Sequence, residues 1–229
     1  MDNLLDSLND SQREAVVYSG GPSLVIAGAG SGKTRVLTYK IAYLLQQGYE
    51  PWSILALTFT NKAAREMKER IGTLVGADRA RYLNMGTFHS VFAHILRREA
   101  EAIGFQPNFT IYDTKDSQSL VKAIVKEMKL DDKQYAAATI FSAISRAKNR
   151  LILPKQYADD TELRDRVKFA KVDQTYQIYV AYQDRLRQAN AMDFDDLLIH
   201  TYLLFKNNED ICRRYADRFR YVLVDEYQD

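Results

Sequence analysis

Two short stretches of this sequence have the residue types and spacing of a site that acts on phosphate groups. The stretch AGAGSGKT, residues 27 to 34, follows the pattern of glycine, four residues and Gly-Lys-Thr, except that Ala27 takes the place of the first glycine. Glycines let the backbone curl so that successive N–H groups point at phosphate oxygens, and a helix that follows adds the positive end of its dipole. We therefore predict a loop that binds a nucleoside triphosphate. The alternative is a plain flexible turn between a strand and a helix.

Each residue type in this loop has a defined task in that prediction. Lys33 would neutralise the β and γ phosphates, and the Thr34 hydroxyl would ligate Mg²⁺. The loop by itself does not choose between a kinase, a GTPase and a motor. The predicted nucleotide contacts of the loop are Ala29, Gly30, Ser31, Gly32, Lys33 and Thr34.

The stretch VLVDEYQD, residues 222 to 229, supplies two adjacent carboxylates after an apolar run. At the end of a core strand, Asp225 can hold Mg²⁺ beside Thr34, and Glu226 can orient and deprotonate a water for attack on the γ phosphate. Taken alone, the stretch could equally be a strand followed by an acidic turn that has no part in chemistry. Together with the phosphate loop it predicts nucleotide hydrolysis, with Lys33 and Glu226 as the catalytic residues.

The hydrophobic pattern predicts the strands and helices that could position these residues. Strands alternate with amphipathic helices at both ends of the chain, which predicts a doubly wound α/β fold with a parallel sheet flanked by helices. The predicted strands are residues 23–27, 53–59 and 221–224, and the predicted helices beside them are 34–48 and 60–76.

The middle of the chain has a different pattern. From about 113 to 205 the apolar spacing is helical, with no convincing buried strand. An inserted all-helical subdomain explains why Lys33 and Asp225, which must meet around one metal ion, stand so far apart in sequence. The predicted organisation is a first α/β segment at 1–112, the helical insertion at 113–192 and a second α/β segment at 193–229.

Within that middle region, two patterns are assigned to structure rather than chemistry. Tyr176, Tyr179 and Tyr182 recur every third residue, which favours core packing on a helix over a ladder for stacking bases. In DFDD, Asp193 is predicted to cap a helix and Asp196 to favour its dipole.

Composition limits the remaining possibilities. Hydrophobic residues make up 46% and charged residues 27%, and the net charge is only +2, as in an ordinary soluble globular protein. Between residues 105 and 192, however, 15 basic side chains outnumber 11 acidic ones, which suits either a DNA backbone or a solvated helical face. The single Cys212, the few scattered histidines and the lack of a long apolar stretch predict a cytoplasmic protein with no membrane span and no histidine or cysteine metal site.

Six motifs, in this order along the chain, resemble those of the UvrD, Rep and PcrA group of superfamily-one DNA helicases. The resemblance covers essentially the whole sequence. The motifs are LNDSQREAV at 8–16, AGAGSGKT at 27–34, TFTNKAA at 58–64, GTFHS at 86–90, AMDFDDLL at 191–198 and VDEYQD at 224–229.

The resemblance implies a RecA-like P-loop domain, interrupted by a helical subdomain that packs over single-stranded DNA. The cofactors it implies are ATP and Mg²⁺, with Gln12 at the adenine edge and Arg35 beside the nucleotide. It also implies 3′ to 5′ DNA unwinding at single-strand to duplex junctions, coupled to ATP hydrolysis.

Contacts with DNA are expected at three places. Phe59 would stack a base, although it could instead be the last core residue of its strand. Thr87 could likewise be only a helix cap. The run SRAKNRLILPK, residues 145 to 155, has four basic side chains and no acidic one, and it is the best candidate of the insertion for contact with the DNA backbone. The predicted DNA contacts are Thr58, Phe59, Asn61, Lys62, Thr87, His89, Arg146 and Lys148.

Family members also need a second RecA-like domain, whose arginines reach the γ phosphate. Because nothing follows Asp229 here, we expect the isolated chain to be nearly inactive and to be a piece of a longer helicase, since an arginine finger contributes about 10³ to 10⁵ in rate. The alternatives are a nucleotide and single-strand binding module without useful catalysis, a helicase-nuclease subunit, and a small-molecule kinase.

Overall fold

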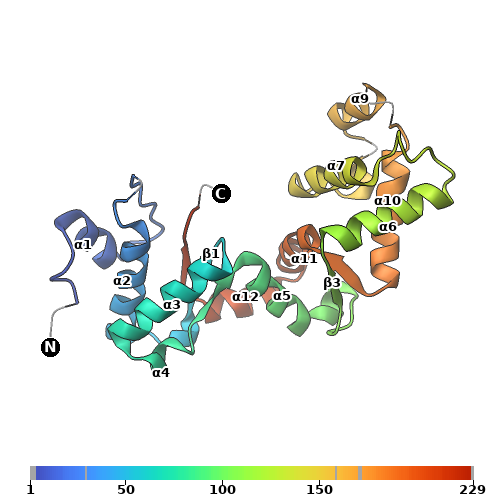
Figure 1. Cartoon of the computed structure of the whole chain (residues 1–229). Coiled ribbons are helices and arrows are strands. Elements are labelled where there is room, and N and C mark those ends of the chain that lie inside the picture. Colours follow the sequence, from blue (N-terminus) through green and yellow to red (C-terminus); the bar gives the residue numbers. More distant parts are fainter. Residues whose placement is uncertain (1–3, 29, 158, 170–171, 228–229) are drawn as a thin grey trace. The chain divides into compact units, whose positions relative to one another are not determined.

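The computed structural model describes residues 4–28, 30–157, 159–169 and 172–227 (Figure 1). Its contacts divide the chain into two compact units. The first unit is discontinuous and combines Met1–Val91 with Glu209–Asp229, and the second is Phe92–Asn208. The second unit therefore contains all of the segment 113–192 and extends beyond it on both sides.

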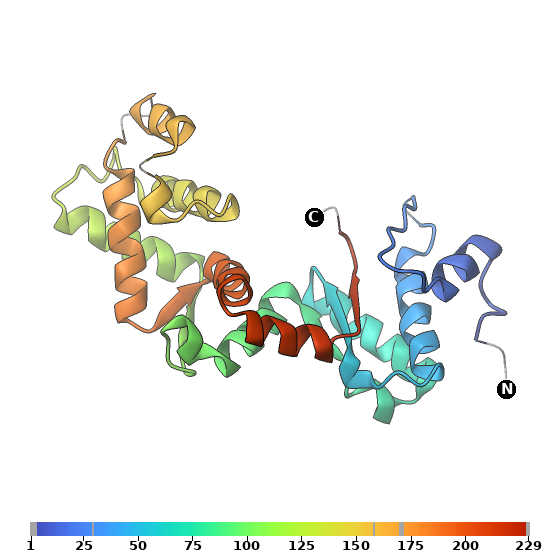
Figure 2. The ribbon, with the colours of Figure 1, turned by 180° about the vertical axis from the view of Figure 1, so that it is seen from behind.

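A three-stranded parallel sheet forms the centre of the first unit. Its order is β2 (Asn84–Thr87), β1 (Ile54–Thr58) and β5 (Tyr221–Val224). In Figures 1 and 2 the strand that leads to the C-terminus lies beside β1, although the two are far apart in sequence. Every residue of β1 is buried, as expected for a central strand covered on both faces. The predicted strands at 53–59 and 221–224 and the α/β class are thus confirmed.

Helices α2 (Lys33–Gln46) and α3 (Asn61–Val75) cover one face of this sheet. Their apolar side chains meet alternate residues of β1, Ile54 and Ala56, in a single buried cluster. Gly48, with φ at +89°, follows the C-cap of α2, and a left-handed residue there lets the last carbonyls of the helix be capped. The shorter elements of this unit are α1 (Asp10–Val17), the 3-10 helix η1 (Pro51–Ser53), α4 (Ala77–Ala80) and α12 (Glu209–Arg218).

The predicted buried strand at 23–27 is wrong. This segment has no regular structure, and Leu24, Val25 and Ile26 are 68%, 45% and 90% exposed. A strand needs a neighbour for its backbone N–H and C=O groups. Both edges of β1 are already taken by β2 and β5, and no strand of the described residues pairs with this segment.

The second unit is mostly helical, although the sequence analysis predicted an all-helical insertion. A short parallel pair, β3 (Thr110–Tyr112) with β4 (Ala191–Asp193), joins the two ends of its helical part. The sequence analysis missed β4, which is buried but only three residues long. Its helices are α5 (Phe88–Arg98), which begins in the first unit, the 3-10 helix η2 (Ala100–Ile103), α6 (Thr114–Glu127), α7 (Ala137–Asn149), α8 (Pro154–Tyr157), α9 (Thr161–Phe169), α10 (Thr175–Gln188) and α11 (Phe194–Asn207). Within the described residues, no helix is both long and apolar enough to cross a membrane.

The core of the second unit lies where α6, α7 and α10 pack together. Ile140 and Ile144 of α7 are fully buried in it. Tyr179 and Tyr182 are buried beside them, and Tyr176 packs partly buried against the same cluster. The interpretation of these tyrosines as core residues is confirmed.

A buried ion cluster ties α7 to the start of α11. Lys148 Nζ lies 2.6 Å from Asp193 Oδ2 and 2.8 Å from Asp196 Oδ1, and the Tyr182 hydroxyl donates to Asp193 Oδ2 at 2.8 Å. Asp193 also caps α11 in a capping box with Asp196, as predicted. Two effects on the pKa of Lys148 oppose each other. Burial acts to lower this pKa, the two carboxylates act to raise it, and the net result is a raised pKa. Lys148 therefore keeps its charge because its two carboxylate partners are present.

Removal of the Lys148 ammonium should destabilise the second unit strongly. In Lys148→Ala two carboxylates stay buried without their cation, which typically costs about 3 to 5 kcal/mol. Urea denaturation followed by circular dichroism measures the loss. Lys122→Ala, at an exposed position on α6, is the matched control and should change the free energy of unfolding by less than about 0.5 kcal/mol. Equal stability of the two variants would contradict this account of the cluster.

Candidate functional site

The phosphate loop makes a tight turn directly before α2. Gly30 and Gly32 have φ values of +76° and +88°, which glycine adopts at little cost. The Ser31 hydroxyl donates to Gly28 O at 2.6 Å, and Lys33 Nζ donates to the carbonyls of Ala27 and Gly28 at 3.2 and 3.4 Å. The lysine therefore holds the loop closed on itself. Ala29 lies outside the described residues.

Gln12 reaches this loop from α1. Its backbone and side chain form a capping box with Asn9, in which Gln12 N donates to Asn9 Oδ1 at 2.9 Å. The free end of the side chain then extends to the loop, where Gln12 Nε2 donates to Ser31 O at 3.0 Å. A methyl group at Gly32 would come within 2.9 Å of the same nitrogen. The structure thus places Gln12 beside the phosphate loop, the segment with which the sequence analysis grouped it as a nucleotide contact.

Thr34 and Arg35 occupy the first turn of α2. Thr34 is half-buried, and its carbonyl accepts a hydrogen bond from Thr38 Oγ1 at 2.7 Å. Arg35 Nη2 donates to Ser7 O at 2.8 Å, and its guanidinium lies over the Tyr39 ring. In this structure Arg35 therefore contacts the segment before α1 rather than the glycines of the loop.

The acidic residues at the end of β5 continue its pairing with β1. Asp225 N donates to Leu57 O at 2.9 Å, so the ladder with β1 continues one residue past the strand, and the Asp225 side chain is buried. Burial and the neighbouring Glu226 carboxylate raise the pKa of Asp225, while the nearby Lys33 ammonium opposes that rise. Glu226 itself has a φ of +53°, an uncommon conformation for a residue with a side chain. The charge of Lys33 therefore acts on Asp225, although the two residues come from opposite ends of the chain.

These residues fit a nucleotide phosphate with Mg²⁺. A methyl group built at Gly28 or Gly30 meets nothing within 4 Å, so open space lies beside the loop. An ammonium and the N-terminus of a 14-residue helix supply positive potential to that space. The Thr34 hydroxyl and the Asp225 carboxylate are oxygen ligands, which Mg²⁺ prefers.

Phe59 is the clearest exposed aromatic among the predicted DNA contacts. It follows β1 directly and is 61% exposed, so it is not the last core residue of the strand. Asn61 and Lys62 begin α3 beside it and are also exposed, and Lys62 Nζ lies 3.9 Å from Glu66. Thr60 caps this helix by accepting from Ala63 N.

The other predicted contacts of the first unit are less accessible. Thr58 is 2% exposed, so its side chain cannot make the contact that we predicted. Thr87 is 8% exposed, and its Oγ1 accepts from Ser90 N at 3.2 Å, which is the geometry of the helix cap that was its alternative. His89 is half-buried in the first turn of α5.

The prediction that Lys148 contacts DNA is wrong. Its side chain is 1% exposed and its ammonium is held by Asp193 and Asp196. The helical spacing of Ile140, Ile144 and Lys148 could have indicated this, because it places the lysine on the buried face. Arg146, two residues earlier, is exposed.

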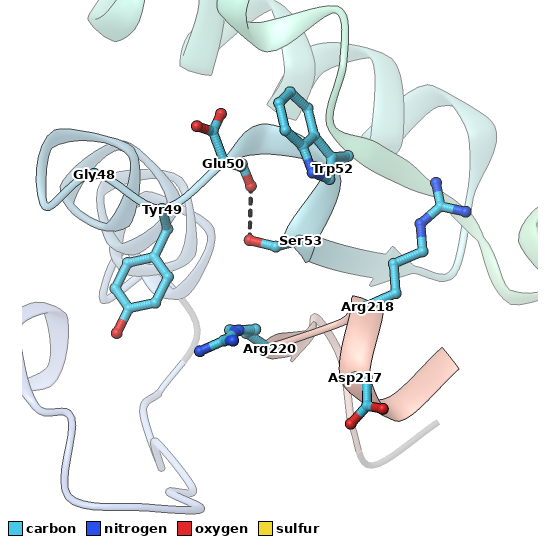
Figure 3. Close-up of a pocket in the computed structure, with 8 residues that line it drawn as sticks. All are labelled: Gly48, Tyr49, Glu50, Trp52, Ser53, Asp217, Arg218 and Arg220. Carbon is cyan, nitrogen blue, oxygen red and sulfur yellow. Dashed lines mark hydrogen bonds between the residues drawn. The ribbon is translucent and has the colours of Figure 1, made fainter. Parts of the chain in front are cut away.

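A pocket of about 480 Å³ lies at the other end of the same sheet (Figure 3). Two of its lining residues, Ser53 and Arg220, directly precede β1 and β5, whereas Phe59 and Asp225 lie past or at the carboxyl ends of those strands. None of the predicted site residues lines it. Since open parallel sheets bind ligands at the carboxyl ends of their strands, this pocket is distinct from the predicted nucleotide site. It is lined by Gly48, Tyr49, Glu50, Trp52, Ser53, Asp217, Arg218 and Arg220.

A glycine loop before a helix, with an acidic residue at the end of a core strand, is the arrangement of a P-loop nucleotide-binding domain. Over residues 8–229 the sequence matches the family described as UvrD/REP helicase N-terminal domain, and the chain belongs to that family.

Similar proteins agree with this assignment. The chain is 46% identical over 230 residues to the ATP-dependent DNA helicase PcrA of Leuconostoc citreum, and 49% identical over 231 residues to the ATP-dependent DNA helicase UvrD1 of Mycobacterium tuberculosis. The PcrA of Staphylococcus aureus is 45% identical over 231 residues. All three matches cover 100% of this chain, which spans only 29 to 30% of the length of these relatives.

Gly32 should be far less replaceable than Gly28. An alanine at position 32 would adopt a left-handed backbone, at a cost of about 1 to 2 kcal/mol, and would press on Gln12. A methyl group built at Gly28 would meet nothing within 4 Å, and Gly28 has no left-handed φ. Titration with a fluorescent ATP analogue should therefore show roughly tenfold or greater loss of affinity for Gly32→Ala and a smaller loss for the matched control Gly28→Ala. A larger loss at Gly28 would argue against this loop geometry.

Proposed function

We propose that this chain is the ATP-binding and single-strand-binding part of an ATP-dependent DNA helicase of 3′ to 5′ polarity. The observation that supports it most is the hydrogen bond from Gln12 Nε2 to Ser31 O of the phosphate loop, in a chain that belongs to a helicase family. The polarity rests on the family resemblance alone.

In this proposal each residue has a role set by its chemistry. Gln12 recognises the adenine edge, and the N–H groups of Gly30, Ser31 and Gly32 hold the phosphates. Lys33 leaves the carbonyls of Ala27 and Gly28 and turns its charge to the β and γ phosphates. Because those two contacts are longer than 3 Å and made to neutral groups, a phosphate is a stronger partner.

Thr34 and Asp225 hold Mg²⁺, which supplies charge neutralisation at the phosphates when it is bound. Asp225 suits this task because it is buried, so its carboxylate would give up little water to the cation. Glu226 orients the attacking water and accepts its proton.

Phe59, Asn61 and Lys62 provide the single-strand contact at the same edge of the sheet. An exposed aromatic ring stacks any base, and the ammonium of Lys62, whose side chain is 79% exposed, balances a phosphate. Arg146 of the second unit is a further phosphate contact. The partner is single-stranded DNA and its junction with duplex, and the second RecA-like domain needed for fast turnover lies in the remainder of a longer protein.

Two variants of the full-length protein separate the hydrolytic and DNA-binding parts of this proposal. Glu226→Gln keeps the shape but cannot accept a proton, so kcat for DNA-stimulated ATP hydrolysis should fall by about 10² to 10⁴ while ATP affinity is retained. Phe59→Ala removes the stacking ring, which is worth about 1 to 3 kcal/mol per base. Its kcat at saturating DNA should change little, while the DNA concentration for half-maximal stimulation rises roughly 5- to 100-fold.

Tyr82→Ala is the matched control for the aromatic variant. Tyr82 is 53% exposed in the same unit but lies before β2, away from the carboxyl ends of the strands. It should leave both parameters unchanged. Full turnover by Glu226→Gln, or equal effects of the Phe59 and Tyr82 substitutions, would refute the corresponding part of the proposal.

A further inference from the structure

Lys40 is a buried lysine in α2 that the proposed reaction does not use. Only 9% of it is exposed, and its Nζ donates to Val16 O at 2.9 Å and also to Tyr18 O. Both carbonyls lie at the end of α1, where the last carbonyls of a helix have no partner within the helix. A cation at that end is also favoured by the helix dipole. Lys40 is therefore a cap for α1 supplied by a neighbouring helix.

Packing alone does not explain a lysine at this position. It stands four residues from Val36 and four from Leu44, both buried, so an apolar residue would suit the helical stripe. Burial lowers the pKa of Lys40, which expresses the cost of keeping this ammonium charged away from water. The two carbonyls, together with the rings of Tyr43 and Tyr221 at 5.9 and 6.0 Å, offset that cost.

Helix α1 depends on such polar ties because its apolar anchoring is small. It has eight residues, of which only Val16 is buried, in a small cluster with Leu8 and Val36, and a helix this short is not stable by itself. Arg35 holds the segment before the helix through Ser7 O, and Lys40 holds its end. Gln12 lies between these two ties and reaches Ser31 O of the phosphate loop.

We propose that Lys40 is a positioning residue for base recognition. By fixing the C-terminal end of α1 on α2, it holds Gln12 at the phosphate loop in the orientation that selects adenine. Lys40 itself touches no nucleotide. This inference rests on the proposed function, in which Gln12 recognises the adenine edge.

The test compares the affinities of fluorescent ATP and GTP analogues in the full-length protein. Lys40→Met keeps the length of the side chain but removes its donors, so the preference for ATP over GTP should fall roughly 2- to 10-fold, the worth of one hydrogen bond. Gln12→Ala should lose the preference, and the double variant should show no further loss. Non-additivity of this kind shows that Lys40 acts through Gln12.

Two controls separate positioning from general stability. Lys40→Arg, which keeps the donors, should restore the preference. Lys68→Met makes the same change at a lysine that donates to Arg81 O on the surface of α3, and it should leave the preference unchanged. A purely structural role would weaken both nucleotides equally and leave their ratio at the wild-type value.

The outcomes distinguish this inference from the proposed function. If Gln12→Ala loses the preference but a folded Lys40→Met retains it, the positioning role is overturned and the proposed function stands. If wild type shows no preference, or Gln12→Ala keeps it, the adenine role of Gln12 itself fails. If Lys40→Met does not fold, Lys40→Gln takes its place, because its amide can still donate to one carbonyl. A reduced preference for ATP supports the positioning role, and an unchanged preference overturns it.

Discussion

The parallel pairing of β1 with β5 is the constraint on which the candidate site depends. The chain leaves the first unit after Val91 and returns only at Glu209, and the pairing joins the two parts. Because the strands run in the same direction, with Leu57 opposite Val224, the residues after them lie at one edge of the sheet. A slip of one residue would turn Asp225 to the other face. The register therefore fixes the side of the sheet on which the Asp225 side chain lies. It also fixes how far Asp225 lies from Phe59 along the edge of the sheet.

Much of the fold could be predicted from the sequence where a local pattern is strong. Strand β5 was predicted with its exact bounds, and α2 and α3 within a residue or two, because their apolar residues repeat clearly. The segment 23–27 shows the limit of this reasoning. Its composition is that of a buried strand, but a strand exists only where another strand accepts it, and that condition is not local. Strand β4, with three residues, is too short to give a pattern.

The candidate site was predictable in its motifs and less so in its individual side chains. The phosphate loop and Asp225 could be predicted from motifs of characteristic residue types. The position of Gln12 beside the loop agrees with its prediction as a nucleotide contact. Lys148 was assigned to DNA because it lies in a run of basic residues, although its helical phase places it in the core. Lys40 has the same feature, a lysine on an apolar helical stripe. For both lysines, the position in the helical period predicts burial better than the charge predicts exposure. The partners that hold a buried ammonium are distant in sequence, so a local pattern does not reveal them.

The central claim is that Asp225 completes the metal site begun by Thr34. The most direct measurement is electron paramagnetic resonance of Mn²⁺, used in place of Mg²⁺, in the presence of ATP. The account predicts that wild type binds Mn²⁺ with ATP, and that Asp225→Asn, which has the same size but no charge, weakens Mn²⁺ binding by roughly tenfold or more while ATP without metal binds as before. Equal Mn²⁺ affinity in the two proteins would contradict the assignment of Asp225 and with it the site described above.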